Sequence, residues 1–403
     1  MLKRLMTKMT ATLLCLTAAT CMTVYAASAN QDSGIAGLSL SDLQKAGYRV
    51  DWINQTSTGD LRLPTITDDS FYAINEDDNL IRYNVTTGEW LWSSAIGNNV
   101  FDLLSINEFH DSNQVYVLSD GVLYVTNTLT GVASASLTGS TKPFQPLRWV
   151  PNTSALTTSN TLVYGSSKGD LVWINPKTGF VSSRYQIGNS VCSTPVLAEG
   201  IRSLNGRNRS LIIGTSSDGS IIAINRGTKS KEWGFKLTAP VTASVSFQTS
   251  PSILEGETLP RSSVFIAGQD QYLRAVDLHT GKPRWKVLTT SPLENSPAIY
   301  GDVLYQRIPS KGLACYETFP NEYAGKLKWT AEDVNGNVIT TTSQGRLVCW
   351  DNNTKQLQIL DSHIGAITAS VSLPTAKQVL ASDTTNGALF ILTEDDEIIR
   401  LAP

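Results

Sequence analysis

Internal repetition is the sequence feature that most constrains the fold of this chain. One copy reads VFIAGQDQYLRAVD from Val264 to Asp277 and continues through Thr280-Gly281 to Trp285. Similar copies run from Leu211 to Trp233 and from Leu162 to Gly179, and weaker ones recur at a spacing of roughly 35 to 50 residues. Each contains two alternating strands joined by a tight turn. We therefore predict an all-β protein, a β-propeller of about eight four-stranded blades.

The composition agrees with many short strands and turns. The chain is 41% hydrophobic and 17% charged, with 29 Gly and 16 Pro. The dipeptides Asp218-Gly219, Lys168-Gly169 and Asp120-Gly121 tolerate the positive φ of a two-residue hairpin. A seven-bladed ring is an alternative interpretation, because the closely spaced units between residues 330 and 400 fit two registers.

The two ends of the chain resemble parts of one blade. Phe71–Asn84 matches Leu389–Ala402 almost position for position, and Tyr48–Trp52 is similar to the segment that ends at Trp285. The C-terminus thus stops one strand short of a complete blade. We expect the N-terminal strand to complete the last blade and close a propeller domain that spans residues 48–403, since an open ring would expose sheet edges.

The first 29 residues have the features of a signal peptide. Lys3, Arg4 and Lys8 precede an apolar run, and small residues at the end of the segment favour cleavage near Ala29. Residues 30–47 are expected to be a linker. Lipid attachment at Cys21 is disfavoured because Thr20 precedes it. We predict export to the periplasm or the medium, with no transmembrane segment.

Charge and cysteine content limit the classes of function. Cleavage removes three positive charges, which takes the formal net charge from −3 to −6. An acidic protein of this kind is not expected to bind nucleic acid, which requires clustered cations. Cys192, Cys315 and Cys349 remain, which permits at most one disulfide; if one forms, we expect it between Cys315 and Cys349, because they occupy neighbouring repeats. The alternative is three small buried side chains.

The sharper copies resemble the pyrroloquinoline-quinone repeat family, whose unit reads approximately VYVGSxDGxLYALDAxTGKxxW. In that family the Trp packs over the Thr-Gly turn of an adjacent blade. The resemblance implies this blade-locking role for four tryptophans: Trp92, Trp233, Trp285 and Trp329. Ala135 and Ser183 stand at the same place in the second and third units, so half of the locks are expected to be missing.

The resemblance implies three classes of function. Quinoprotein dehydrogenases carry a vicinal Cys-Cys pair, which this chain lacks, so we expect no cofactor and no enzymatic activity. BamB-type propellers, which assist outer-membrane assembly, and uncharacterised exported repeat proteins agree better with its size. The main hypothesis is a monomeric, non-catalytic scaffold that binds a protein partner, with the cell envelope as the candidate location. The alternative is a quinoprotein-like oxidoreductase with its site in the central channel.

Residues capable of chemistry are sparse. His110, His279 and His363 have no second His or Cys at metal-ligand spacing, so no metal site and no catalytic residue is expected. The acidic triplets Glu76–Asp78 and Glu394–Asp396 occupy equivalent hairpins and are explained by turn chemistry.

Loops are the best place for function on a rigid ring. Three longer segments qualify: Leu197–Arg209, Ser252–Arg261 and Thr318–Lys326. The third combines aromatic and polar side chains, as interfaces do. We therefore predict that Phe319 and Tyr323 bind the partner.

Overall fold

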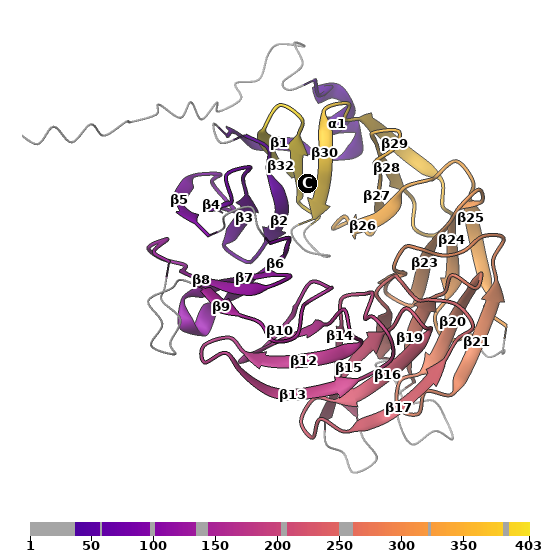
Figure 1. Ribbon diagram of the computed structural model, residues 1–403. Helices are drawn as coiled ribbons and strands as arrows, with labels where there is room; N and C mark the ends of the chain where they lie inside the picture. The colour runs from indigo at the N-terminus through magenta and orange to yellow at the C-terminus, as the bar shows by residue number, and fades with distance from the viewer. Residues whose placement is uncertain are drawn as a thin grey trace, which may run out of the picture.

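The chain folds into a ring of eight sheets, each with four antiparallel strands (Figure 1). The computed structural model describes residues 37–56, 59–96, 101–133, 144–202, 208–249, 261–320, 324–381 and 387–403. These residues confirm the predicted eight-bladed propeller, and the seven-bladed alternative is wrong. Residues 330–400 could be divided into repeats in two ways because the seventh and eighth blades have short connections. In the structure each of these blades forms a full four-stranded sheet.

Strand bounds follow the repeats. The first four blades are β2 (Arg62–Ile66), β3 (Ser70–Ile74), β4 (Asn79–Asn84) and β5 (Trp90–Ala95); β6 (Leu103–Phe109), β7 (Gln114–Ser119), β8 (Val122–Asn127) and β9 (Phe144–Pro146); β10 (Leu156–Thr158), β11 (Thr161–Gly165), β12 (Asp170–Asn175) and β13 (Phe180–Gln186); β14 (Val196–Arg202), β15 (Asn208–Thr215), β16 (Ser220–Asn225) and β17 (Lys231–Lys236).

The last four blades are β18 (Ser246–Thr249), β19 (Ser262–Ala267), β20 (Tyr272–Asp277) and β21 (Pro283–Leu288); β22 (Ala298–Tyr300), β23 (Val303–Ile308), β24 (Gly312–Glu317) and β25 (Leu327–Ala331); β26 (Asn337–Thr341), β27 (Leu347–Asp351), β28 (Gln356–Leu360) and β29 (Ile367–Ser372); β30 (Ala376–Ala381), β31 (Leu389–Thr393), β32 (Glu397–Ala402) and β1 (Arg49–Gln55). Two short helices complete the described secondary structure, α1 (Leu40–Ala46) and the single 3₁₀ turn His110–Ser112.

The first strand of each blade lies nearest the centre of the ring (Figure 1), and several of these strands contact the first strand of the next blade. Hydrophobic clusters fill the spaces between neighbouring blades. At the third junction, for example, Leu171 and Trp173 of one blade pack against Ile212 and Ile222 of the next. The core is thus divided among the blade junctions, and each blade depends on its two neighbours.

Tight turns fix the register of the hairpins. In the third blade Gly169 has a φ of 85°, and a Cβ there would lie 1.6 Å from the carbonyl oxygen of Asn189. Only glycine fits this position. Asp78 and Asp396, the last residues of the two acidic triplets, adopt positive φ at equivalent places. This geometry agrees with the turn role expected for these triplets.

The N-terminal strand closes the ring as predicted. β1 pairs antiparallel with β32, from Arg49 opposite Ala402 to Gln55 opposite Glu397, in a sheet ordered β1-β32-β31-β30. The indigo strand lies beside the yellow ones in Figure 1. The two ends of the chain therefore hold one blade together.

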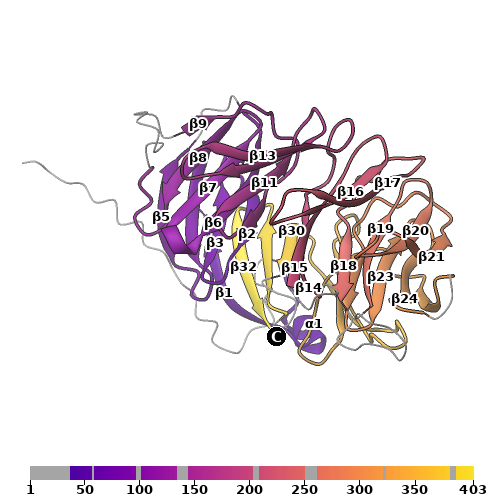
Figure 2. The ribbon, with the colours of Figure 1, turned by 90° about the horizontal axis from the view of Figure 1, so that it is seen from below.

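Part of the segment expected to be a linker is packed. α1 begins after Ser39, whose hydroxyl accepts a hydrogen bond from the backbone N–H of Asp42, and it buries Leu43 and Ala46. The helix contacts β29, and it lies at the same rim of the ring as the C-terminus (Figure 2). The signal peptide expected over residues 1–29 lies outside the described residues.

The three cysteines of the described chain are free, so the disulfide expected between Cys315 and Cys349 is wrong. Both thiols are buried in the cluster between the sixth and seventh blades, where they act as small apolar side chains. Burial raises the pKa of Cys315 to about 12 and also raises the pKa of Cys349, so both stay protonated. No described helix has the length and apolar character needed to cross a membrane.

Candidate functional site

The turn between β24 and β25 in the sixth blade departs from the repeat. In the fifth blade the equivalent turn is short, because Asp277 accepts hydrogen bonds from the backbone N–H groups of His279 and Thr280 at 3.0 and 2.8 Å. The sixth blade has Glu317 in place of Asp277, and nine residues separate Glu317 from the start of β25, against five between Asp277 and the start of β21. The longer turn carries Phe319 beside the fifth blade.

A groove of about 370 Å³ lies where this turn meets the fifth blade. This volume is within the range of small binding sites. Its lining combines cationic, aromatic and proline side chains: Arg261, Asp277, Thr280, Lys282, Pro283, Arg284, Trp285, Thr318, Phe319 and Pro320. Phe319 is partly buried there, whereas Tyr323 lies outside the described residues.

The rear of the groove is held rigidly. Trp285 is 3% exposed, donates its Nε1 hydrogen to the backbone oxygen of Thr318 at 3.1 Å, and lies 6.4 Å from the ring of Tyr316 in a stacked arrangement. The first residues of the long turn are therefore held against the fifth blade by this hydrogen bond. A preformed wall of this kind lowers the entropic cost of binding.

The groove has a positive lining. Three of its side chains are cationic, Arg261, Lys282 and Arg284, against the single carboxylate of Asp277. Asp277 is already paired with Arg284 at 2.5 Å. The Nε of Arg284 is buried and has no hydrogen-bond partner among the described residues, so it is a donor that an incoming acceptor could use.

The four tryptophans identified from the repeat all contact the following blade from an outermost strand. Each donates its Nε1 hydrogen to a backbone carbonyl and lays its ring against a glycine: Trp92 on Thr128 O (2.6 Å) and Gly131, Trp233 on Leu278 O (2.8 Å) and Gly281, Trp285 on Thr318 O (3.1 Å) and Gly325, and Trp329 on Ser362 O (3.1 Å) and Gly365. We call these residues junction tryptophans, and we predict that they stabilise the ring.

Sequence reasoning missed a fifth junction tryptophan. Trp52 on β1 lies against Gly88 of the first blade and makes an edge-to-face contact with Phe390 at 5.9 Å. The similarity between Tyr48–Trp52 and the segment ending at Trp285 was the available signal. Unlike the other four, Trp52 has no hydrogen-bond partner for Nε1 in the described part of the chain.

In the third blade the tryptophan lies on the third strand of the blade instead of the outermost one. Trp173 on β12 lies opposite Ser183 on β13, whereas in the fourth blade Ala223 lies opposite Trp233. Trp173 is 1% exposed and belongs to the cluster between the third and fourth blades. The turn of the fourth blade that faces this ring has Lys229 at the position where the turns facing the other tryptophans have glycine. The Nζ atom of Lys229 lies 5.3 Å from the Trp173 ring. Burial, with Arg226 nearby, lowers the pKa of Lys229.

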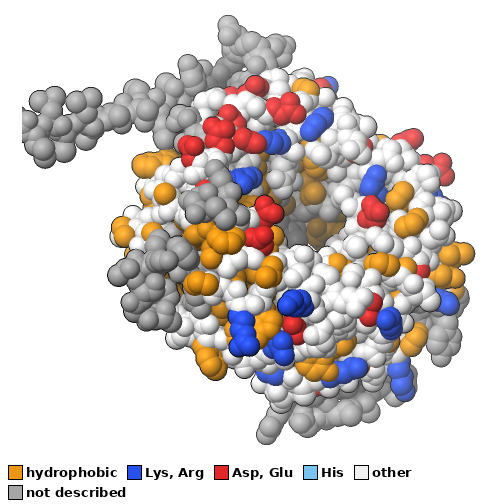
Figure 3. Space-filling model, viewed as in Figure 1, with side chains coloured by type: hydrophobic (Ala, Val, Ile, Leu, Met, Phe, Trp, Pro, Cys, Tyr) orange, Lys and Arg blue, Asp and Glu red, His pale blue; other side chains and the backbone are white. Residues whose placement is uncertain are grey.

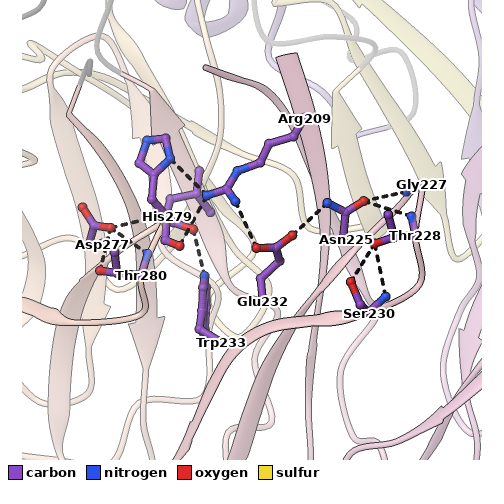
Figure 4. A network of polar contacts seen from close by, with 11 residues as sticks. Arg209, Asn225, Gly227, Thr228, Ser230, Glu232, Trp233, Asp277, His279 and Thr280 are labelled. Atoms are coloured by element: carbon purple, nitrogen blue, oxygen red, sulfur yellow. Dashed lines mark hydrogen bonds and ion pairs between the residues drawn. The ribbon is translucent and has the colours of Figure 1, made fainter. Parts of the chain in front are cut away.

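The basic segment Leu197–Arg209 is largely hairpin, since β14 and β15 occupy most of it. Figure 4 shows Arg209 between Glu232 and His279, at the junction of the fourth and fifth blades. Its guanidinium donates to Glu232 at 3.0 Å and contacts His279 Nδ1 at 3.1 Å. Glu232 also accepts from Asn225 at 2.8 Å. This network joins the fourth and fifth blades.

A second cavity of about 270 Å³ lies on the third blade, where Arg148 and Arg184 stand 5.0 and 5.4 Å from the ring of Trp149. The protein's own guanidinium groups are stacked on this ring. Of the two cavities, the groove beside Phe319 therefore offers the better aromatic surface to a ligand. Ser252–Pro260, another predicted loop, lies outside the described residues.

Comparisons with known proteins agree with the repeat. The family model described as outer membrane protein assembly factor BamB matches residues 36–233 and 193–332. The chain belongs to this family. No curated protein matches the sequence.

Two solved structures are similar in fold to this BamB-family chain. BamB from Moraxella catarrhalis is 14% identical, with a TM-score of 0.63, and the match covers 88% of this chain and 98% of that one. The computationally designed Ika8 protein is 12% identical, with a TM-score of 0.61 and coverage of 86% and 96%. At these identities the likeness shows the fold, so the binding chemistry must come from this chain's own surface.

Proposed function

We propose that this BamB-family protein is an exported, non-catalytic scaffold that binds a segment of a protein partner in the groove between its fifth and sixth blades. The observation that carries the proposal is the long sixth-blade turn, which places Phe319 over a positively charged groove with a fixed tryptophan wall. Variable turns on a rigid ring are where a propeller can gain binding without changing its core.

The lining defines the chemistry of the partner. Lys282 is exposed at the edge of the groove, and the Nε of Arg284 offers a buried donor. Both favour an acceptor such as an Asp or Glu carboxylate. Phe319 and Pro320 supply apolar contact, which aromatic residues at interfaces provide efficiently. We infer an acidic segment that also carries an apolar or aromatic side chain.

The N-terminal sequence and the family support a location in the cell envelope. Lys3, Arg4 and Lys8 followed by an apolar run are typical of a cleaved signal peptide. The family is described by a role in outer membrane protein assembly. We infer that the mature protein starts near residue 30 and meets its partner outside the cytoplasm.

The experiment is quantitative capture from the envelope fraction with tagged mature protein and mass spectrometry. Phe319→Ala and Lys282→Glu should each reduce the captured partner by roughly tenfold, because central interface residues dominate affinity. The matched controls are Phe180→Ala and Lys177→Glu, which change exposed residues of the third blade. Equal capture by the groove variants and the controls would contradict the proposal.

The alternative is a quinoprotein-like oxidoreductase, and it makes a different prediction. A quinone site in the channel should give stoichiometric binding of pyrroloquinoline quinone, followed by turnover of an alcohol or sugar in a dye-linked assay. The scaffold proposal expects neither when quinone and calcium are added. Quinone binding with turnover would replace the scaffold by an enzyme.

A further inference from the structure

Three metal-ligating side chains meet at the junction of the first and second blades. Asp69 precedes β3 in the first blade, whereas in the second blade Glu108 is the last residue but one of β6 and His110 begins the 3₁₀ turn. Their ligand atoms all lie within 4.8 Å of one another. We propose that Asp69, Glu108 and His110 bind a divalent transition-metal ion of the zinc class, which would connect the two blades.

The geometry is close to that of a coordination sphere. The Nδ1 atom of His110 is 3.8 Å from Oε1 of Glu108, which is too far for a hydrogen bond. Two ligands of a tetrahedral ion with bonds of about 2.1 Å stand about 3.4 Å apart. A small rotation of exposed side chains would bring the three groups to this spacing, since the side chains of Asp69 and His110 are 61% and 55% exposed.

Glu108 is a buried carboxylate at the centre of the cluster. Its side chain is 3% exposed, and it accepts a hydrogen bond from the Thr67 hydroxyl at 2.8 Å. Burying a carboxylate without strong compensation costs free energy, which makes the site attractive to a cation. Ligating carboxylates in metal sites are commonly held by such outer hydrogen bonds.

A second observation at the same place concerns a buried hydroxyl group. The Tyr72 hydroxyl, in a residue that is fully buried, lies near the Ser70 and Glu108 side chains but makes no hydrogen bond of good geometry with the residues described. A buried hydroxyl without a partner is costly, and a water on a bound ion would supply one. Tyr72 is therefore a positioning residue for the ion's water.

Arg82 is the charge that opposes a cation here. Its Nη2 lies 3.3 Å from Asp69, but its other nitrogens are held by Ser70 at 2.8 Å and by the Thr128 carbonyl at 2.6 Å. Arg82 balances one of the two carboxylates, which leaves one negative charge for the ion. The Thr128 carbonyl also accepts from Trp92, so the site adjoins a junction tryptophan.

The ligand set selects the class of metal. One imidazole with two carboxylates suits zinc and its neighbours, whereas calcium and magnesium prefer sets made only of oxygen. Three protein ligands with an exposed side leave a fourth position for water. Sequence reasoning missed this site because Asp69 comes from a different blade than Glu108 and His110, and because no second His or Cys stands near His110 in the sequence.

The test is isothermal titration of tag-free, chelator-treated mature protein with zinc chloride, in parallel with calcium chloride. We expect one zinc ion per chain, and His110→Ala and Glu108→Gln should each weaken binding by at least about tenfold. His363→Ala, which removes an exposed histidine from the seventh blade, should bind as the unmodified protein does.

His110 is exposed, so its replacement should leave folding intact and keep the result interpretable if Glu108→Gln fails to fold. A Cys192→Ser variant should retain the site, which excludes zinc capture by that thiol. No stoichiometric zinc binding by the unmodified protein would overturn the proposal. Equal binding by the His110→Ala and His363→Ala variants, or tighter binding of calcium than of zinc, would also overturn it.

Discussion

Replacing Trp52 and Trp233 by phenylalanine, one at a time, separates the two contributions of a junction tryptophan. The residues are 4% and 5% exposed, so each change removes a similar apolar surface and should cost about 1 kcal/mol. Only Trp233 donates to a carbonyl, that of Leu278 at 2.8 Å. Leaving that buried oxygen unpaired adds about 1–3 kcal/mol. We expect Trp233→Phe to be the more destabilising by that amount.

The measurement is urea denaturation of the mature protein, followed by circular dichroism, with the slope of the transition compared among variants. Trp52→Ala and Trp233→Ala are the controls for loss of the whole side chain, and each should cost about 3–5 kcal/mol. Equal losses for the two phenylalanine variants would refute the hydrogen-bond argument. An unchanged transition for Trp52→Ala would refute a stabilising role for this residue in ring closure.

Three further changes have definite outcomes. Deleting Glu397–Pro403 removes the strand that pairs with both β1 and β31, so calorimetry should show the whole unfolding transition shifted down or lost; a transition like that of the intact protein would contradict closure through β32. The hydrogen bond from Lys236 holds the pKa of Asp218 well below its ordinary value. Its stabilising contribution is therefore fully present above about pH 4 and is lost progressively as the pH falls toward the lowered pKa, so Asp218→Asn should be less stable than the unmodified protein at neutral pH, and the difference should shrink steadily as the pH is lowered below about 4; a gap that stays constant with pH would contradict the pairing. Cys315 and Cys349 should react with a thiol reagent only after unfolding, and a melting temperature lowered by reductant would show a disulfide instead.

The repeat allowed the architecture to be predicted in detail. The similarity of Phe71–Asn84 to Leu389–Ala402 identified the incomplete last blade. Inner strands such as β3 and β19 are buried on both faces, because each blade packs between two neighbours. Such local patterns determine a propeller because each blade is one repeat packed on its neighbours. The four tryptophans identified from the repeat lie at blade junctions for the same reason.

Features that join residues far apart in sequence were harder to predict. Trp173 and Lys229 meet across two blades, and they compensate for the serine at position 183 in a way that no single repeat reveals. Asp69 and Glu108 are far apart in the sequence, so their proximity in the structure could not be predicted from it either. Arg209 lay in a segment that resembled a basic loop, yet its side chain bridges Glu232 and His279. Such contacts depend on how blades are placed side by side.

Site-specific photo-crosslinking tests the central claim, that the groove beside Phe319 holds a protein partner, most directly. A benzophenone side chain is placed at position 319 and, as the matched control, at position 180, where Phe180 is 68% exposed on the third blade. After irradiation of intact cells, the account predicts one discrete adduct at position 319 that is absent at position 180 and is lost when Lys282→Glu is added. No adduct at position 319, or the same adducts at both positions, would contradict it.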